Sequence, residues 1–308
     1  LFQQALEIDP DFAPAWAGLA HAYSVAEFYV TDEQLAEYGD QHAKSLAAAQ
    51  RALELEPNQP SALHAIGNYH LTRFEWARAQ AYYETALEAD PDSTDIMEDY
   101  GSMLMYSLQM DESREVIERM LQLDPYVPLF RHVAAGFYNM LDQRELRNQH
   151  INRLNELAPG SWFAAGWNLN KLLEDDDPDA IHQNIHRISA EPWASSDDLQ
   201  AAADWLRNPE QEPSPAVLNA VKFWQDFAIK AGRFDVFYQS ALTDPPNMML
   251  SAGMQLYAPI LPPEGQHRMR AHPGAKELLS TIRLPEYWDQ VGWPDLCRRT
   301  GKDDFECF

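Results

Sequence analysis

The segments ALELEP (52–57), ALEADP (86–91) and MLQLDP (120–125) are three versions of one helix ending. Each ends in a proline, and Pro159 follows the third proline at the same interval of 34 residues. Proline removes a backbone donor and disfavours helical geometry in the residue before it, so each segment predicts the end of a helix. A period of 34 residues is typical of arrays built from pairs of antiparallel helices.

The first complete unit opens with Trp16-Ala17-Gly18-Leu19-Ala20-His21-Ala22-Tyr23. This octapeptide resembles the Trp-x-x-Leu-Gly-x-x-Tyr first helix of the tetratricopeptide repeat (TPR), with Ala20 at the glycine position. Trp16, Leu19 and Tyr23 form an apolar stripe at helical spacing. The resemblance implies an all-α fold: a right-handed TPR superhelix, or α-solenoid, with degenerate C-terminal helical repeats and an irregular cap.

Three further units keep apolar residues at the core positions and Gly or Ala at the small position. Their first helices carry Leu63, Ile66 and Gly67, then Met97, Tyr100 and Gly101, then Ala134, Ala135 and Tyr138. We therefore expect a TPR array over 1–159. Agreement between spacing, residue size and helix propensity at each unit is what specifies a single fold.

The first unit is longer than the others. Pro10 and Pro57 are 47 residues apart, which places 13 extra residues near 28–41. Thr31 to Gln34 resembles a capping box and predicts a long second helix running to about Leu55. The insertion either forms a protruding contact surface or folds back over the first repeat.

After Pro159 the 34-residue period is lost. We expect degenerate helical repeats over 160–243, and C-terminal helices with an aromatic cap over 244–308. Helices are predicted near 196–206, 216–231, 234–242 and 248–256, with a break at the proline-rich stretch 209–215.

The aromatic tail LPEYWDQVGWPDLC (284–297) resembles the C-terminal ending of bacterial TPR proteins in which a class III nucleotide cyclase or a winged-helix domain precedes the repeats. This resemblance implies an alternative to a plain scaffold: the sensory or regulatory portion of a signalling protein whose output domain lies upstream. The chain also opens like the end of an earlier repeat, so we expect further sequence before it.

The composition limits the partners. A formal net charge of −25 repels phosphates and anionic headgroups, so we expect neither nucleic acid nor membrane to bind this segment. A protein or peptide of neutral to basic character is the favoured partner. Localisation stays open: cytoplasmic, or periplasmic if a membrane span lies upstream. The sequence has no GxSxG, GxGxxG or phosphate-loop motif, so we expect a non-enzymatic binding module without cofactor or metal.

The first helices of stacked hairpins line the concave surface, where such folds take extended ligands. The candidate groove residues are His21, His64, Asn68, Leu71, Glu98, Ser102, Met105, His132, Asn139, Phe163, Trp167 and Asn170. His64, Glu98 and His132 fall one per repeat, and such a row suggests titration or metal binding. Helices about 8–10 Å apart make joint ligation awkward, so ordinary groove polarity is the favoured interpretation.

Two cysteines, Cys297 and Cys307, lie near the end of the sequence. They are too few for a disulfide-dense scaffold or a four-ligand zinc site. They either form one disulfide or stay unpaired.

Overall fold

A computed structural model describes the whole chain except residues 27–39, 175–177, 189–194, 244–259 and 303. The chain divides into two compact units, Leu1–Leu123 (unit 1) and Asp124–Phe308 (unit 2). This division places the fourth predicted repeat in unit 2, and the boundaries at 159 and 243 stay predictions. In the described part of the chain, no helix is both long and apolar enough to cross a membrane.

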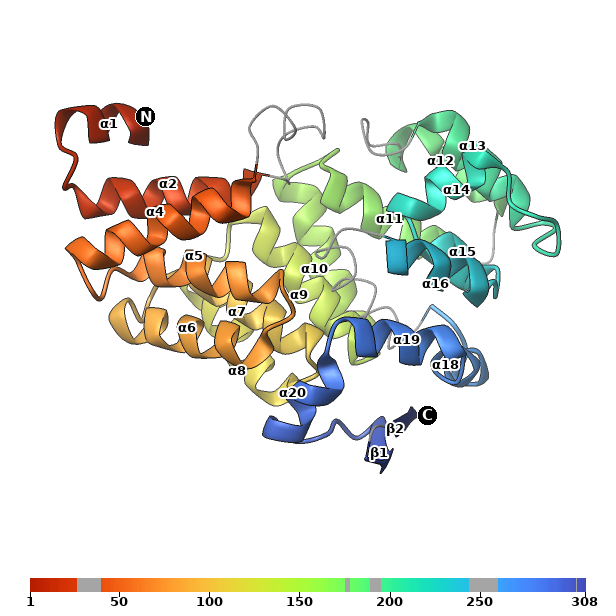
Figure 1. Cartoon of the computed structure of the whole chain (residues 1–308). Coiled ribbons are helices and arrows are strands. Elements are labelled where there is room, and N and C mark those ends of the chain that lie inside the picture. Colours follow the sequence, from red (N-terminus) through yellow and green to blue (C-terminus); the bar gives the residue numbers. More distant parts are fainter. Residues whose placement is uncertain (27–39, 175–177, 189–194, 244–259, 303) are drawn as a thin grey trace. The chain divides into compact units, whose positions relative to one another are not determined.

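Helices make up nearly all the regular structure of both units (Figure 1). Unit 1 contains α1 (Phe2–Ile8), α2 (Ala13–Ser24), α4 (Gln41–Leu55), α5 (Pro60–Leu71), α6 (Trp76–Ala89), α7 (Thr94–Tyr106) and α8 (Met110–Leu123). Unit 2 contains α9 (Pro128–Met140), α10 (Arg144–Leu157), α11 (Trp162–Glu174), α12 (Pro178–Ile188), α13 (Ser196–Trp205), α14 (Pro215–Phe223), α15 (Asp226–Lys230), α16 (Phe234–Thr243), α18 (Pro263–Arg270), α19 (Pro273–Thr281), α20 (Leu284–Val291), β1 (Cys297–Gly301) and β2 (Asp304–Cys307).

The predicted helix hairpins are confirmed: α5 packs on α6, α7 on α8, and α9 on α10. The periodic prolines act as the sequence predicts. Glu56, Asp90 and Ala158, each directly before such a proline, leave helical geometry with ψ of 98°, 86° and 65°. The chain has the all-α solenoid architecture of TPR-like hairpins.

The turns inside the hairpins share one backbone feature. Phe74, Leu108 and Asp142 adopt positive φ of 57°, 64° and 52°, again at intervals of 34 residues. In each turn the amide of the next residue donates to the carbonyl oxygen five residues before it, over 2.9 Å. This closure of the first helix is a Schellman-type cap, and here it is made without glycine.

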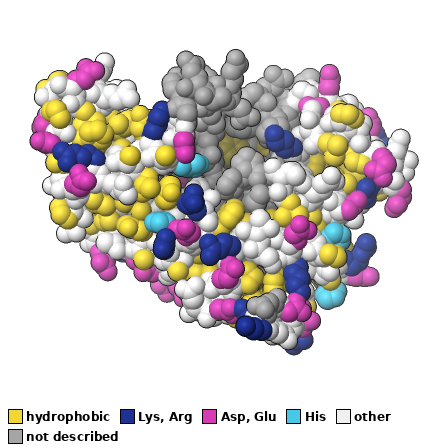
Figure 2. Space-filling view, in the orientation of Figure 1, with side chains coloured by type: hydrophobic (Ala, Val, Ile, Leu, Met, Phe, Trp, Pro, Cys, Tyr) yellow, Lys and Arg dark blue, Asp and Glu magenta, His cyan; other side chains and the backbone are white. Residues whose placement is uncertain are grey.

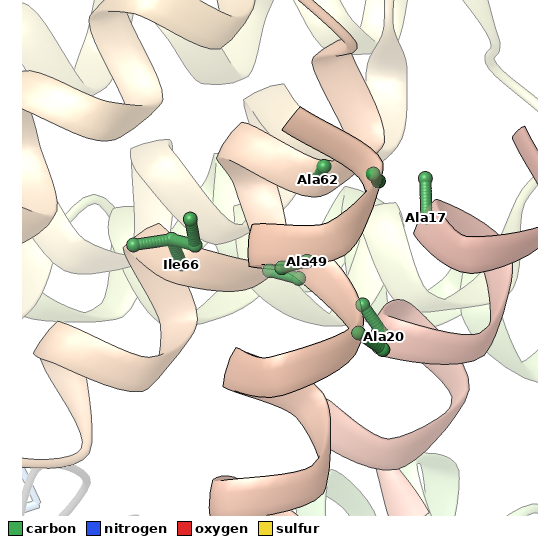
Figure 3. Packing of buried hydrophobic residues seen from close by; sticks show 8 residues of the cluster. Ala17, Ala20, Ala49, Ala62 and Ile66 are labelled. Carbon is green, nitrogen blue, oxygen red and sulfur yellow. The ribbon is translucent and has the colours of Figure 1, made fainter. Parts of the chain in front are cut away.

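The core of unit 1 forms where small residues let α2, α4 and α5 approach closely. The cluster comprises Ala17, Ala20, Ala48, Ala49, Ala52, Ala62, Ala65 and Ile66 (Figure 3). Helices α5 and α6 also pack closely, because a Cβ built at Gly67 of α5 would lie 2.8 Å from the Tyr83 ring of α6. The predicted role of the small-residue position is therefore confirmed at this hairpin.

The second helix of the first unit differs from the prediction. It begins at Gln41, and Asp40 caps it by accepting a hydrogen bond from the Ala43 amide. Asp40 has a non-helical ψ of 99°, so one continuous helix from Thr31 to Leu55 is wrong. Most of the predicted insertion, 28–41, lies outside the described residues.

In unit 2, helices α11 to α14 pack in sequence order, and α16 packs on α14, α15 and α19. The helix predicted over 216–231 is two helices, because Trp224 has an extended φ of −127° between α14 and α15. The helix predicted near 248–256 lies outside the described residues.

The tail is more regular than the predicted irregular cap. β1 and β2 pair antiparallel as a hairpin, and a disulfide joins Cys297 to Cys307 across it. Of the two alternatives that the sequence left open, one disulfide or two unpaired cysteines, the structure has the disulfide.

Candidate ligand groove

A polar cluster connected by hydrogen bonds and one ring contact joins the first helices of three successive hairpins in unit 1. It comprises His21 on α2, His64 and Asn68 on α5, and Glu98, Asp99 and Ser102 on α7. We call these six residues the polar cluster. Five of them are predicted groove residues, and Asp99 is the addition that the structure makes.

Asp99 holds the polar cluster together. His64 Nε2 lies 2.6 Å from Asp99 Oδ2, and Asn68 Nδ2 donates to the same oxygen over 2.8 Å. Tyr83 in turn donates its hydroxyl to Asn68 Oδ1 over 2.5 Å, which fixes the amide orientation. The His64 side chain is 3% exposed and that of Asp99 is 29% exposed, so the carboxylate is the part of the pair that solvent reaches.

The two adjacent carboxyl groups have pKa values that move in opposite directions. Burial raises the pKa of Asp99, but the hydrogen bonds from His64 and Asn68 outweigh burial, and the pKa lies below its usual value. Burial, followed by the charge of Asp99, raises the pKa of Glu98 well above its usual value. Ser102 lies 3.4 Å from Glu98 Oε1 and opposes this shift. The polar cluster therefore combines a carboxyl group whose pKa is lowered with a neighbouring one whose pKa is raised.

His21 closes one end of the polar cluster. Its ring centroid lies 5.4 Å from that of His64. Burial, followed by the neighbouring His64, lowers the pKa of His21. Its Nδ1 is buried and has no hydrogen-bond partner among the described residues. A ligand that donates a hydrogen bond to this nitrogen would satisfy it.

The other predicted groove residues of unit 1 are packed more deeply. Leu71 and Met105 are 8% and 2% exposed, and Ser102 is 4% exposed. Asn68, Glu98 and His21 are half-buried. Any ligand of the polar cluster therefore meets these three side chains and Asp99 first.

Unit 2 brings four aromatic rings together on α9 and α11. The His132 ring lies 4.8 Å from Phe163, 6.0 Å from Trp167 and 5.9 Å from Trp162. Trp167 Nε1 donates to His132 Nδ1 over 3.1 Å, so the neutral imidazole carries its proton on Nε2. Burial lowers the pKa of His132 to about 4. His132 is consequently neutral near pH 7.

The two predicted asparagines of unit 2 are engaged within the unit. Asn139 accepts a hydrogen bond from the buried Arg147 over 3.0 Å, and Arg147 also forms a bidentate ion pair with Glu174. Asn170 donates to Asp226 of α15 over 3.2 Å. Both asparagines are 7% exposed. Their role in ligand binding stays a prediction.

The predicted row of His64, Glu98 and His132 is arranged differently. His64 pairs with Asp99 instead of Glu98, and His132 belongs to the other unit and contacts aromatic rings. Outside the undescribed gaps, the structure contains no group of three or more His, Cys, Asp or Glu residues that could hold a metal ion.

A regular offset explains why Asp99 was missed. The contacts His64–Asp99 and His132–Trp167 both join residues 35 apart, one more than the repeat period. Comparison of equivalent positions alone therefore selects Glu98, whereas the neighbouring hairpin presents the next residue. The pairing of Arg147 with Glu174 was also missed, because no sequence pattern links these two residues.

No protein-family model matches the chain. It is similar to the transcriptional regulator HilA of Salmonella typhimurium and of Salmonella typhi, with 28% identity over 165 residues, and of Salmonella paratyphi A, with 27% identity. The alignment covers 49% of this chain but only 28% of the length of those proteins. Among solved structures, the chain is similar to YrrB, described as a TPR protein with an unusual peptide-binding site, with a TM-score of 0.40, 16% identity, and coverage of 65% of this chain and 92% of YrrB.

Proposed function

We propose that this chain is a non-catalytic scaffold that binds an extended peptide or protein segment at the polar cluster of unit 1, and that Asp99 and Glu98 take a basic side chain of the partner. The single observation that carries this proposal is the polar cluster itself. Three hairpins contribute side chains to it, and the side chains of Asp99 and Glu98 are partly exposed.

The charge of the site favours a cation. The lowered pKa of Asp99 favours its ionised form, and a Lys or Arg side chain would form a charge-assisted hydrogen bond with this partly exposed carboxylate. The formal net charge of −25 also attracts basic partners over a distance and increases their rate of association.

Glu98 couples binding to protons. A cation beside this carboxyl group lowers its raised pKa, so the group releases its proton when the ligand arrives. Affinity for a basic peptide should therefore increase with pH until Glu98 is ionised in the free protein. A partner that lacks a basic side chain would not show this dependence.

The test is an array of extended peptides that differ only in one central residue: Lys, Arg, Glu or norleucine. The Lys or Arg peptide that binds most tightly is then tested against two single variants. It should bind each of Asp99→Asn and Glu98→Gln at least tenfold more weakly than it binds the unsubstituted protein. Glu88→Gln, a change at an exposed glutamate of α6, is the matched control and should bind normally. Calorimetry in two buffers of different ionisation enthalpy should report proton release. Equal binding of the Lys and norleucine peptides, or full affinity in both variants, would refute the proposal.

A second candidate function rests on the similarity to HilA. Those relatives are transcriptional regulators, and the aligned region is a minor part of their length. By this alternative the scaffold is the regulatory portion of a larger signalling protein, and the ligand of the polar cluster controls an output domain elsewhere. Sequencing the complete gene tests it, because an adjoining cyclase or winged-helix domain is required.

A further inference from the structure

Unit 2 carries a group of aromatic rings on α9 and α11 that the function proposed above does not use. We call His132, Trp162, Phe163 and Trp167 the aromatic patch. Phe163 and Trp167 are four residues apart and therefore share one face of α11. The centroid of the Phe163 ring lies 4.0 Å from that of Trp162 and 4.8 Å from that of His132. Because the aromatic patch belongs to unit 2, its role is separate from that of the polar cluster in unit 1.

Part of the aromatic patch is open to solvent. Trp162 is 43% exposed, and the other three rings are half-buried. The hydrogen bond from Trp167 Nε1 to His132 Nδ1, over 3.1 Å, fixes the relative orientation of two of the rings. The aromatic patch is therefore a preformed apolar surface, and a ligand that covers it orders few side chains on binding.

The hydrogen-bonding character of the aromatic patch is one-sided. Phenylalanine has no polar side-chain atom and the indole of tryptophan only donates, so His132 supplies the one side-chain acceptor, Nδ1. Trp167 occupies that acceptor, and the His132 proton is on Nε2. Nε2 has no acceptor among the residues that the structure describes, and it is not one of the buried atoms that lack a partner. The four side chains thus offer ring faces and an accessible N–H donor, but no free acceptor.

The aromatic patch is also electrostatically quiet. Acidic and basic side chains are spread over the face of the chain that Figure 2 shows. Burial alone nevertheless lowers the pKa of His132, and no charged side chain in the described part of the chain contributes to that shift. The pKa of His21 in the polar cluster, by contrast, responds to Asp99 and Asp95. A cationic ligand of the aromatic patch would depend on the ring faces alone, which attract cations only weakly at exposed sites.

A ligand that complements this surface presents apolar faces and acceptors but few donors. Proline meets these requirements, because its ring is apolar, its carbonyl oxygen accepts and its nitrogen carries no hydrogen. Other residues would place backbone N–H groups against a surface without a free acceptor, which costs them their hydrogen bonds to water. Proline-rich segments also adopt the polyproline II conformation before they bind, and aromatic-lined grooves recognise them in other proteins.

We propose that the aromatic patch binds a proline-rich segment of a partner protein in the polyproline II conformation. Proline rings stack on the faces of Trp162 and Phe163, and a prolyl carbonyl oxygen accepts a hydrogen bond from His132 Nε2. The size of the aromatic patch suits such a segment. Polyproline II rises about 3.1 Å per residue, so about four residues cross rings whose centroids all lie within 6.0 Å of that of His132.

The experiment measures fluorescence anisotropy with the full chain and three labelled peptides of one length: hexaproline, hexaalanine, and a Gly-Ser peptide with one central trimethyl-lysine. Hexaproline should bind saturably, and hexaalanine at least tenfold more weakly. Trp162→Ala should lower the affinity for hexaproline at least tenfold while circular dichroism stays unchanged. Phe12→Ala removes an aromatic ring of unit 1 with a similar exposure of 45%, and this matched control should bind hexaproline normally.

A second measurement keeps the proposal testable if Trp162→Ala fails to fold. In the isotopically labelled, unsubstituted protein, hexaproline should shift the indole N–H resonances of Trp162 and Trp167, which Trp162→Phe and Trp167→Phe assign. The resonance of Trp76, a buried residue of α6 in unit 1, should not move. Asp99→Asn should leave the affinity for hexaproline unchanged, so failure of the polar cluster to bind basic peptides would not affect this result.

The proposal is overturned if hexaproline and hexaalanine bind equally well, or if the Trp162 and Trp167 resonances stay fixed while hexaproline binds. It is also overturned if the trimethyl-lysine peptide binds Asp99→Asn more tightly than hexaproline does, because the ligand of the aromatic patch would then be a cation. Self-association that Trp162→Ala abolishes, in a chain that does not bind hexaproline, would assign the aromatic patch to contacts with a second copy of the chain and would overturn the proposal as well.

Discussion

The buried ion pair of unit 2 makes the sharpest prediction about stability. Arg147 on α10 and Glu174 at the end of α11 have side chains only 2% and 10% exposed. The guanidinium donates over 2.5 and 2.8 Å to the two carboxylate oxygens and over 3.0 Å to Asn139. Arg147→Met keeps much of the side-chain volume but leaves the Glu174 carboxylate buried without its cation.

Removing one partner of a buried ion pair costs about 3–5 kcal/mol, because the remaining charge cannot recover its hydration. For a unit of this length, each kcal/mol lowers the melting temperature by about 2–4 °C, so Arg147→Met should lower it by roughly 6–20 °C. The double variant Arg147→Met/Glu174→Leu buries no charge. It should recover to within about 1 kcal/mol of the unsubstituted protein, or exceed it.

Urea and thermal unfolding, followed by circular dichroism, measure these differences. Arg144→Met is the control on the same helix, since the Arg144–Asp142 pair is 55% and 64% exposed and should contribute no more than about 1 kcal/mol. The reasoning fails if Arg147→Met costs no more than the control, or if the double variant is as unstable as Arg147→Met alone.

Three further predictions concern other parts of the chain. Gly67→Ala forces a Cβ to within 2.8 Å of the Tyr83 ring, and overpacking of about 1–3 kcal/mol should exceed the helix-propensity gain of about 1 kcal/mol; a variant that melts no lower contradicts this. Burial raises the pKa of Asp226 to about 6, so the stability that its protonated form contributes is fully present below about pH 4 and is lost as the pH rises through 6. The free energy of unfolding of Asp226→Asn in urea, relative to that of the unsubstituted protein, should therefore increase between pH 4 and 6, and a difference that does not change with pH would contradict the shift. Replacing Cys297 and Cys307 with serine removes a bridge that spans 10 residues and should destabilise the tail hairpin by about 2–3 kcal/mol, detected as faster amide exchange in β1 and β2; equal exchange rates would contradict a constraining role.

The sequence predicts the hairpins well because two local signals repeat together. Proline at a fixed interval ends the second helices, and Gly67 occupies the position where two helices approach closely. The turns were less predictable, because Phe74 and Leu108 adopt a left-handed conformation that sequence patterns usually associate with glycine. In those turns the tertiary fold determines the backbone conformation.

The candidate site was only partly predictable for a geometric reason. The repeat period identifies which helices are neighbours, but the relative rotation of neighbouring hairpins decides which side chains meet. The contact of His64 with Asp99, one residue beyond the equivalent position, depends on that rotation. Likewise, the hydrogen bond from Asn170 to Asp226 depends on α15, whose separation from α14 the sequence pattern did not indicate.

The polar cluster also changes the order in which the hairpins of unit 1 should unfold. A linear array usually frays from its ends, because each repeat contacts only its neighbours. Here the His21 ring of the first hairpin lies 5.4 Å from the His64 ring of the second, and His64 is hydrogen-bonded to Asp99 of the third. A ligand bound to Asp99 would therefore also restrain the first hairpin through His64 and His21, and its binding would be detected as slower amide exchange in α2 and α4.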